Sequence, residues 1–159
     1  AVEKGVRRAL AEGVIGGYPV VDLRVIVHDG KTHPVDGKEI AFITAGRKAV
    51  IEAILAAAPS VLEPIVEMLV DVPDGSIGEV TGDLAARRGH VTGTASRGGG
   101  SAAVSALVPL GEITEYSSRL KAMTGGAGNF SYAFAHYAPA PPSLQRQLSA
   151  SFTARDDDD

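Results

Sequence analysis

The order in which strand-like and helix-like patterns follow one another in residues 63–140 constrains the fold of this chain more than any other feature of its sequence. Some segments of this region have the two-residue alternation or the composition of strands, and others have apolar residues at helical spacing. In chain order they are a strand from Pro64 to Val72, a helix over 77–84, strands over 91–96 and 102–110, a helix over 113–123 and a strand over 130–136. This order predicts a ferredoxin-like βαββαβ domain, in which two helices cover one face of a four-stranded antiparallel sheet.

Capping and turn residues mark the ends of these predicted elements. Ser76-Ile77-Gly78-Glu79 matches a capping box, and Gly89 is expected to end the helix that the box begins. The sequence Arg97-Gly98-Gly99-Gly100-Ser101 predicts a hairpin between the two middle strands. The alternating aromatic residues of the last strand could form a base-stacking platform, but we interpret them as core packed against the two helices.

The first part of the chain has two predicted helices and very little predicted sheet. Helical spacing begins at Val2 and ends at Gly16-Gly17, a strand is predicted from Tyr18 to His28, and a second helix from Lys38 to Ala58. The second helix is apolar around most of its circumference, so we expect it to be largely buried. Because a sheet of one or two strands is marginal by itself, we expect this part to be an incomplete α/β two-layer domain, truncated at its amino end.

These patterns divide an α+β chain into three parts. We expect the incomplete domain in residues 1–62, the ferredoxin-like domain in 63–140, and a carboxy-terminal helix with an acidic tail in 141–159.

The composition is that of an ordinary globular protein, with 45% hydrophobic and 21% charged residues. No apolar run reaches the roughly 18 residues of a membrane span, so no membrane partner is expected. The absence of cysteine excludes disulfides and thiolate metal sites and fits a cytoplasmic protein, and the four histidines are too far apart to predict a metal site. The net charge of −4 includes the acidic run Asp156–Asp159, so charge by itself does not indicate a nucleic-acid partner.

A Gly30-Lys31-Thr32 triplet resembles the end of a phosphate-binding loop, but the rest of the Walker A motif is missing. That motif requires a glycine at the position of Val25, and residues 23–27 have the β-branched composition of a strand. We therefore predict that this chain binds no nucleotide and carries no catalytic residue, metal or cofactor of its own.

Several stretches, in order and over most of the chain, resemble the carboxy-terminal part of translation elongation factor G. They are AVEKGVRRALAEGVIGGYPVVDLRV (1–25), DGKTHPVD (29–36), VLEPIVE (61–67), GEVTGDLAARRGHVTG (78–93), ALVPLGEITEYSSRLKAMTGG (106–126) and FAHY (134–137). The resemblance implies that residues 1–62 are the later half of domain IV, whose fold is shared with a small-subunit ribosomal protein, and that 63–140 are domain V. It also implies a GTPase parent, whose GTP and magnesium belong to an amino-terminal domain absent from this chain.

The same resemblance implies which loop of domain IV reaches the decoding region. Lys31, Thr32 and His33 fall on the loop at the tip of that domain, which contacts the transfer RNA–messenger RNA duplex during translocation. Without the resemblance, these residues would be interpreted as ordinary polar residues of a turn.

Candidate residues in the second domain have two alternative interpretations. Arg87 and Arg88 follow a predicted helix, where they either complement the helix dipole or face ribosomal RNA. Tyr116 is a further candidate, since the resemblance places it near the expected contact with the sarcin–ricin loop. The implied partner is the ribosome, bound by a monomeric cytoplasmic factor.

Two departures from the family pattern suggest a divergent paralogue. The loop before the last strand reads Gly-Ala-Gly (126–128) where the family usually has a basic residue, and Glu115 stands where glycine is usual. A carboxylate there would repel phosphates. The leading hypothesis is a translocation factor; the alternatives are a paralogue acting in ribosome recycling, rescue or antibiotic protection, and a ferredoxin-like regulatory domain that binds a small ligand.

Overall fold

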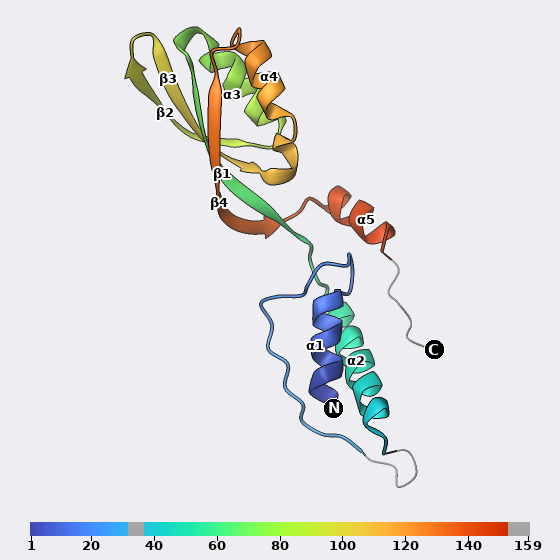
Figure 1. Cartoon of the computed structure of the whole chain (residues 1–159). Helices are drawn as coiled ribbons and strands as arrows, with labels where there is room; N and C mark the ends of the chain where they lie inside the picture. Colours follow the sequence, from blue (N-terminus) through green and yellow to red (C-terminus); the bar gives the residue numbers. More distant parts are fainter. Residues whose placement is uncertain (32–36, 153–159) are drawn as a thin grey trace. The chain divides into compact units, whose positions relative to one another are not determined.

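The computed structural model describes residues 1–31 and 37–152, which belong to two compact units (Figure 1). One unit is formed by the residues before Leu62 together with those after Pro139, and the other is Leu62–Pro139. Helix α5 (Pro142–Ala150) belongs to the first unit, in which the Val61 N–H donates to Gln145 Oε1 over 3.1 Å. The sequence-based division had placed this helix in a part of its own.

The second unit has the predicted order of strands and helices. Its elements are β1 (Leu62–Pro73), the 3₁₀ turn η1 (Asp74–Ser76), α3 (Ile77–Ala86), β2 (His90–Gly98), β3 (Ser101–Pro109), the 3₁₀ turn η2 (Leu110–Ile113), α4 (Tyr116–Met123) and β4 (Asn129–Pro139). The strands form one antiparallel sheet in the order β2-β3-β1-β4. The predicted ferredoxin-like fold is therefore confirmed.

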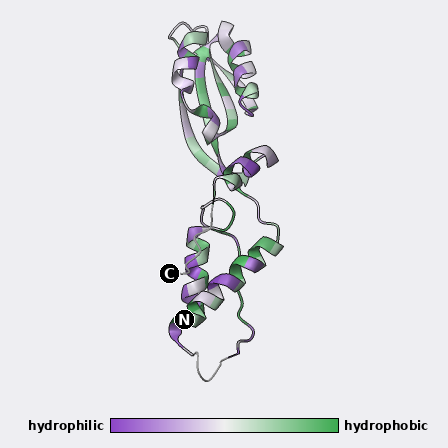
Figure 2. Cartoon of the chain, turned by 90° about the vertical axis from the view of Figure 1, so that its right-hand side faces the viewer, coloured by the Kyte–Doolittle hydropathy of each residue, from purple (hydrophilic) through white to green (hydrophobic). Residues whose placement is uncertain are grey.

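The core of this unit lies between the sheet and its two helices (Figure 1). The register of β1 and β3 places Val70 opposite Val104 and Met68 opposite Ala106, and all four side chains are fully buried. Val80 of α3 packs against this face, as do the other buried residues of α3 and α4. The apolar colouring of the central strands in Figure 2 follows this arrangement.

The predicted capping box does not form, although its helix does. Ser76 makes no side-chain capping hydrogen bond to α3. Its backbone is nearly helical, with φ −96° and ψ −5°, because it also closes the turn η1. An N-cap hydroxyl reaches the first-turn amides from an extended backbone, which Ser76 does not have.

The aromatic residues of β4 are only partly core, so our interpretation of them was wrong for most of the row. Phe130 packs against the core and meets the Tyr116 ring edge-on, with 5.1 Å between ring centroids. Tyr132 and Phe134 share its face of the sheet but are 53% and 60% exposed. β4 is an edge strand of the sheet, and of these three described residues only Phe130 packs against the core.

The helices of the first unit, α1 (Val2–Glu12) and α2 (Glu39–Ala56), pack closely on each other. Val6, Ala9 and Val50 form the buried centre of the pair. A Cβ atom added to Gly5 would overlap the Ile43 carbonyl oxygen, so the two backbones meet with no room for a side chain. Glycine is therefore required at this crossing.

Two expectations about this unit are wrong for the same reason. Residues 18–28 form no strand, because a strand exists only through hydrogen bonds to a neighbour and the described residues of this unit provide none. Helix α2 is not largely buried: Ile40 is 64% and Leu55 is 51% exposed, and among the described residues its buried contacts are with α1. The apolar pattern was recognised correctly, but the surface that would cover it is not among the described residues.

Candidate nucleic-acid interface

The connection between β3 and α4, residues 110–116, is a short loop fixed at several points. It begins with the turn η2, and the buried side chain of Ile113 anchors it to the core. Glu115 has a left-handed backbone with φ +62°, a conformation that glycine adopts without cost and other residues adopt only when the surroundings impose it. The Thr114 hydroxyl donates to the Gly111 carbonyl oxygen over 3.4 Å. The loop thus holds a strained residue between two fixed ends.

Helix α3 ends beside this loop in a Schellman motif. The Gly89 N–H donates to the Leu84 carbonyl over 2.8 Å, and the Arg88 N–H donates to the Ala85 carbonyl over 3.1 Å. Glycine usually occupies the left-handed position of this motif, but here it is Arg88, with φ +59°. The sequence predicts this helix over 77–84 with Gly89 as its stop; α3 in fact ends at Ala86, and the strained position, Arg88, lies one residue before the glycine.

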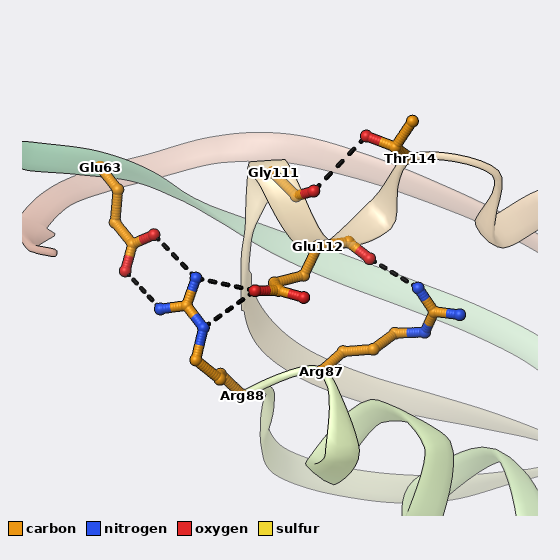
Figure 3. A network of polar contacts seen from close by, with 6 residues as sticks. All are labelled: Glu63, Arg87, Arg88, Gly111, Glu112 and Thr114. Atoms are coloured by element: carbon orange, nitrogen blue, oxygen red, sulfur yellow. Dashed lines mark hydrogen bonds and ion pairs between the residues drawn. The ribbon is translucent and has the colours of Figure 1, made fainter. Parts of the chain in front are cut away.

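The Arg88 side chain joins two acidic residues from other elements (Figure 3). Its Nη1 and Nη2 atoms donate to the two carboxylate oxygens of Glu63 over 2.6 and 3.0 Å, and its Nε donates to Glu112 Oε1 over 3.0 Å. Hydrogen bonding to Glu63, and then to Glu112, holds the pKa of the Arg88 guanidinium above its ordinary value, although burial acts in the opposite direction. A bidentate pair of this kind fixes geometry as well as charge.

The neighbouring Arg87 binds the same loop from its other side. Its Nη1 donates to the Glu112 main-chain carbonyl over 2.7 Å, and its Nε donates to Asp83 Oδ2 over 2.8 Å (Figure 3 shows the first of these bonds). Arg119 of α4 donates to the other oxygen of Asp83 over 3.0 Å. Burial acts to raise the pKa of Asp83, but the hydrogen bonds from Arg87 and Arg119 outweigh it, so the pKa lies below its usual value.

Tyr116 lies inside the domain. Its side chain is fully buried, and the Arg87 guanidinium lies over the ring, 5.3 Å from the centroid. Burial raises the pKa of the Tyr116 hydroxyl to about 12, and that hydroxyl has no hydrogen-bond partner within residues 1–31 and 37–152. The ring therefore supports the loop from within and does not form part of its exposed surface.

The structure thus brings together Arg87, Arg88 and Tyr116, the candidates of the second domain. Sequence reasoning missed the acidic residues that pair with the arginines. Asp83 could have been found, because it lies four residues before Arg87 on one helix, but Glu63 is 25 residues from Arg88 and no local pattern links them.

The remaining candidates, Lys31, Thr32 and His33, belong to the first unit. Lys31 is exposed, whereas Thr32 and His33 lie outside the described residues. In the described part of the chain, no His, Asp and Glu side chains gather in a way that could hold a metal ion. No helix there combines the length and apolar character needed to cross a bilayer.

Fold and site together define a ferredoxin-like α+β module that presents a braced loop beside a cluster of paired charges. Comparison with known proteins identifies the family. Residues 1–58 match elongation factor G domain IV and residues 60–148 match the elongation factor G C-terminus, so the chain belongs to the elongation factor G family.

Individual relatives agree with this assignment. The chain is 49% identical to elongation factor G 2 of Streptomyces coelicolor over 92% of its length, and 46% identical to an elongation factor G-like protein of Mycobacterium tuberculosis over 94%. The crystal structure of ttk003000868 from Thermus thermophilus has a TM-score of 0.78 and 38% identity over 93% of the chain. The chain spans 21% of each of the two curated relatives and 22% of the solved chain, about a fifth of their length.

Proposed function

We propose that this chain is the ribosome-facing, carboxy-terminal part of an elongation-factor-G-like translational GTPase that promotes movement of transfer and messenger RNA during protein synthesis. The observation that carries the proposal is the pair of adjacent matches, domain IV followed by the C-terminus, in one uninterrupted chain. In this proposal the work of the chain is mechanical: it binds RNA while the remaining four fifths of a longer protein bind GTP and magnesium and hydrolyse the nucleotide. The factor acts as a monomer in the cytoplasm.

Two surfaces carry the proposed contacts with RNA. The segment containing Lys31, Thr32 and His33 approaches the transfer RNA–messenger RNA duplex in the decoding region. Cationic and hydroxyl side chains suit the phosphates and 2′-hydroxyls of RNA. In the second unit, the region of Arg87, Arg88 and Tyr116 approaches ribosomal RNA.

A second candidate is a specialised paralogue that acts in ribosome recycling, rescue or antibiotic protection. It is favoured by the names of the relatives, elongation factor G 2 and elongation factor G-like protein, and by the carboxylate of Glu115 on the candidate loop. The parent protein should be placed in cells depleted of their principal elongation factor G. Growth would favour the translocation factor, and failure to grow, with normal expression, would favour the paralogue.

The tip loop provides a direct test of translocation. In the parent protein, His33→Ala should slow single-round translocation while leaving GTP hydrolysis unchanged, because the loop lies outside the nucleotide-binding part. A loop residue without buried partners usually changes stability by less than about 0.5 kcal/mol when replaced, so the melting temperature should hardly move. His28→Ala, at an exposed position of the same segment, is the matched control. A strongly destabilised His33→Ala protein would show that the histidine is a packed structural residue.

A further inference from the structure

The arginines at the end of α3 are already bound to groups within their own unit. Three N–H groups of Arg88 donate to Glu63 and Glu112, and two of Arg87 donate to Asp83 and the Glu112 carbonyl. Their charges are offset as well, because the carboxylates that they bind lie within hydrogen-bond distance. A cation that contacts phosphate contributes through its unneutralised charge. These side chains are therefore poorly suited to bind a phosphate directly.

Both arginines bind the same loop residue, Glu112, one at its main chain and the other at its side chain. Arg87 binds the main-chain carbonyl of Glu112, whereas Arg88 binds its carboxylate (Figure 3). Arg87 also covers the ring of Tyr116, which ends the loop. The strained residue Glu115 lies between these two fixed points.

The strained backbone of Arg88 is part of the same arrangement. Its left-handed conformation is less stable than an ordinary helical backbone for a residue that carries a side chain. Such strain persists only where the surroundings determine it. The bidentate bond to Glu63 at the start of β1 and the bond to Glu112 provide those surroundings.

We propose that Arg87 and Arg88 are positioning residues: they brace the loop 110–116, and Arg88 pairs with the charge of Glu112, so that the loop keeps one shape for ribosomal RNA, and they do not themselves contact phosphate. This inference rests on the proposed function, in which the loop region faces ribosomal RNA. It assigns RNA contact to the exposed polar groups of the loop and to the first turn of α4, where Ser117 and Ser118 are exposed.

A double-mutant cycle on ribosome affinity distinguishes positioning from direct contact. The intact 159-residue chain, Arg88→Ala, Glu112→Ala and the double variant would each be titrated with purified bacterial ribosomes. Bracing predicts that each single variant weakens binding by about tenfold, and that the double variant is hardly weaker than either, because each residue acts through the other. Direct contact predicts the opposite sign for Glu112→Ala, which removes a negative charge and frees the Nε–H of Arg88 while its bonds to Glu63 remain, and so should tighten binding.

The salt dependence and a conservative substitution give independent readouts. Loss of a phosphate contact should lower the slope of log affinity against log salt by about one, whereas loss of a brace should leave that slope unchanged. Arg88→Lys keeps the charge but not the bidentate geometry. If Arg88 is a brace, Arg88→Lys should bind as weakly as Arg88→Ala; if Arg88 contacts phosphate, Arg88→Lys should bind nearly as well as the parent chain. Glu67→Ala, which removes an exposed charge from β1, is the control for net charge and should not weaken binding.

Hydrogen exchange on the chain without ribosomes separates this inference from the proposed function. Bracing predicts at least tenfold faster exchange of the amides of residues 113–116 in both Arg88→Ala and Glu112→Ala, with the sheet amides unchanged. Unchanged loop exchange would overturn the bracing role whether or not the chain binds ribosomes. Accelerated loop exchange in a chain that binds no ribosomes would confirm the brace and contradict the proposed function, together with the RNA-binding purpose assigned to the brace.

Discussion

Val80→Asp should unfold the second unit at neutral pH. Val80 of α3 has no exposed surface and packs against the buried face of the sheet. An introduced carboxylate would therefore be left in the core without a partner. Unpaired buried charges are among the few changes that cost about 4 kcal/mol or more, a large fraction of the stability of a small domain. Circular dichroism and urea denaturation would measure the loss.

The sign of the pH dependence tests the cause of that loss. Burial raises the pKa of an introduced carboxyl, so its destabilising effect should be largest above that raised pKa and should shrink as the pH falls through it. Ala85→Asp, on the exposed side of the same helix, should cost less than about 1 kcal/mol. Equal stability of the two variants would mean that the buried side of α3 has been misassigned.

Gly5→Ala should separate the two long helices of the first unit. The added methyl group would overlap the Ile43 carbonyl and lie 3.0 Å from the Arg47 amide nitrogen, and backbone atoms inside a helix cannot move aside. The small core around Val6 and Val50 would open, and the free energy of unfolding would fall by about 3 kcal/mol, as expected when an overpacked core cannot rearrange. Hydrogen exchange should therefore accelerate in both helices, and the sheet of the other unit serves as an internal reference.

Gly82→Ala is the matched control for this change. It makes the same substitution in helix α3, where a Cβ atom would meet nothing within 4 Å. Alanine is the better helix former by up to about 1 kcal/mol, so this variant should be at least as stable as the parent. If Gly5→Ala behaved like Gly82→Ala, the close approach of α1 and α2 would not exist in solution.

The fold of the second unit could be predicted from the sequence because its apolar patterns are satisfied locally. Each strand finds its neighbours within residues 62–139, so periodicity alone gives both the elements and the face that they bury. The same reasoning failed for residues 18–28, whose β-branched composition favours a strand but cannot provide a neighbouring strand. It also failed for Tyr132 and Phe134, because alternation shows which residues share a face and not how far the helices extend over it.

The arginines of the candidate site could be predicted from the sequence, but the bonds that they form and the backbone conformation of Arg88 could not. Adjacent arginines after a helix suggest either a dipole effect or an RNA contact, and nothing nearby in the sequence reveals the bond between Arg88 and Glu63. The left-handed backbone of Arg88 was also hidden, since Gly89 beside it is the residue that a Schellman motif usually uses. Both features depend on contacts between elements that are distant in sequence.

The most direct test of the account is whether this chain, by itself, binds the ribosome. Sedimentation of the purified 159-residue chain with bacterial ribosomes should show saturable binding that weakens as salt rises and that intact elongation factor G displaces. Displacement matters because it shows that the chain occupies the site of the factor and not an arbitrary charged surface. A folded chain that stays in the supernatant at low salt, or that remains bound when intact elongation factor G is in excess, would contradict the proposed function.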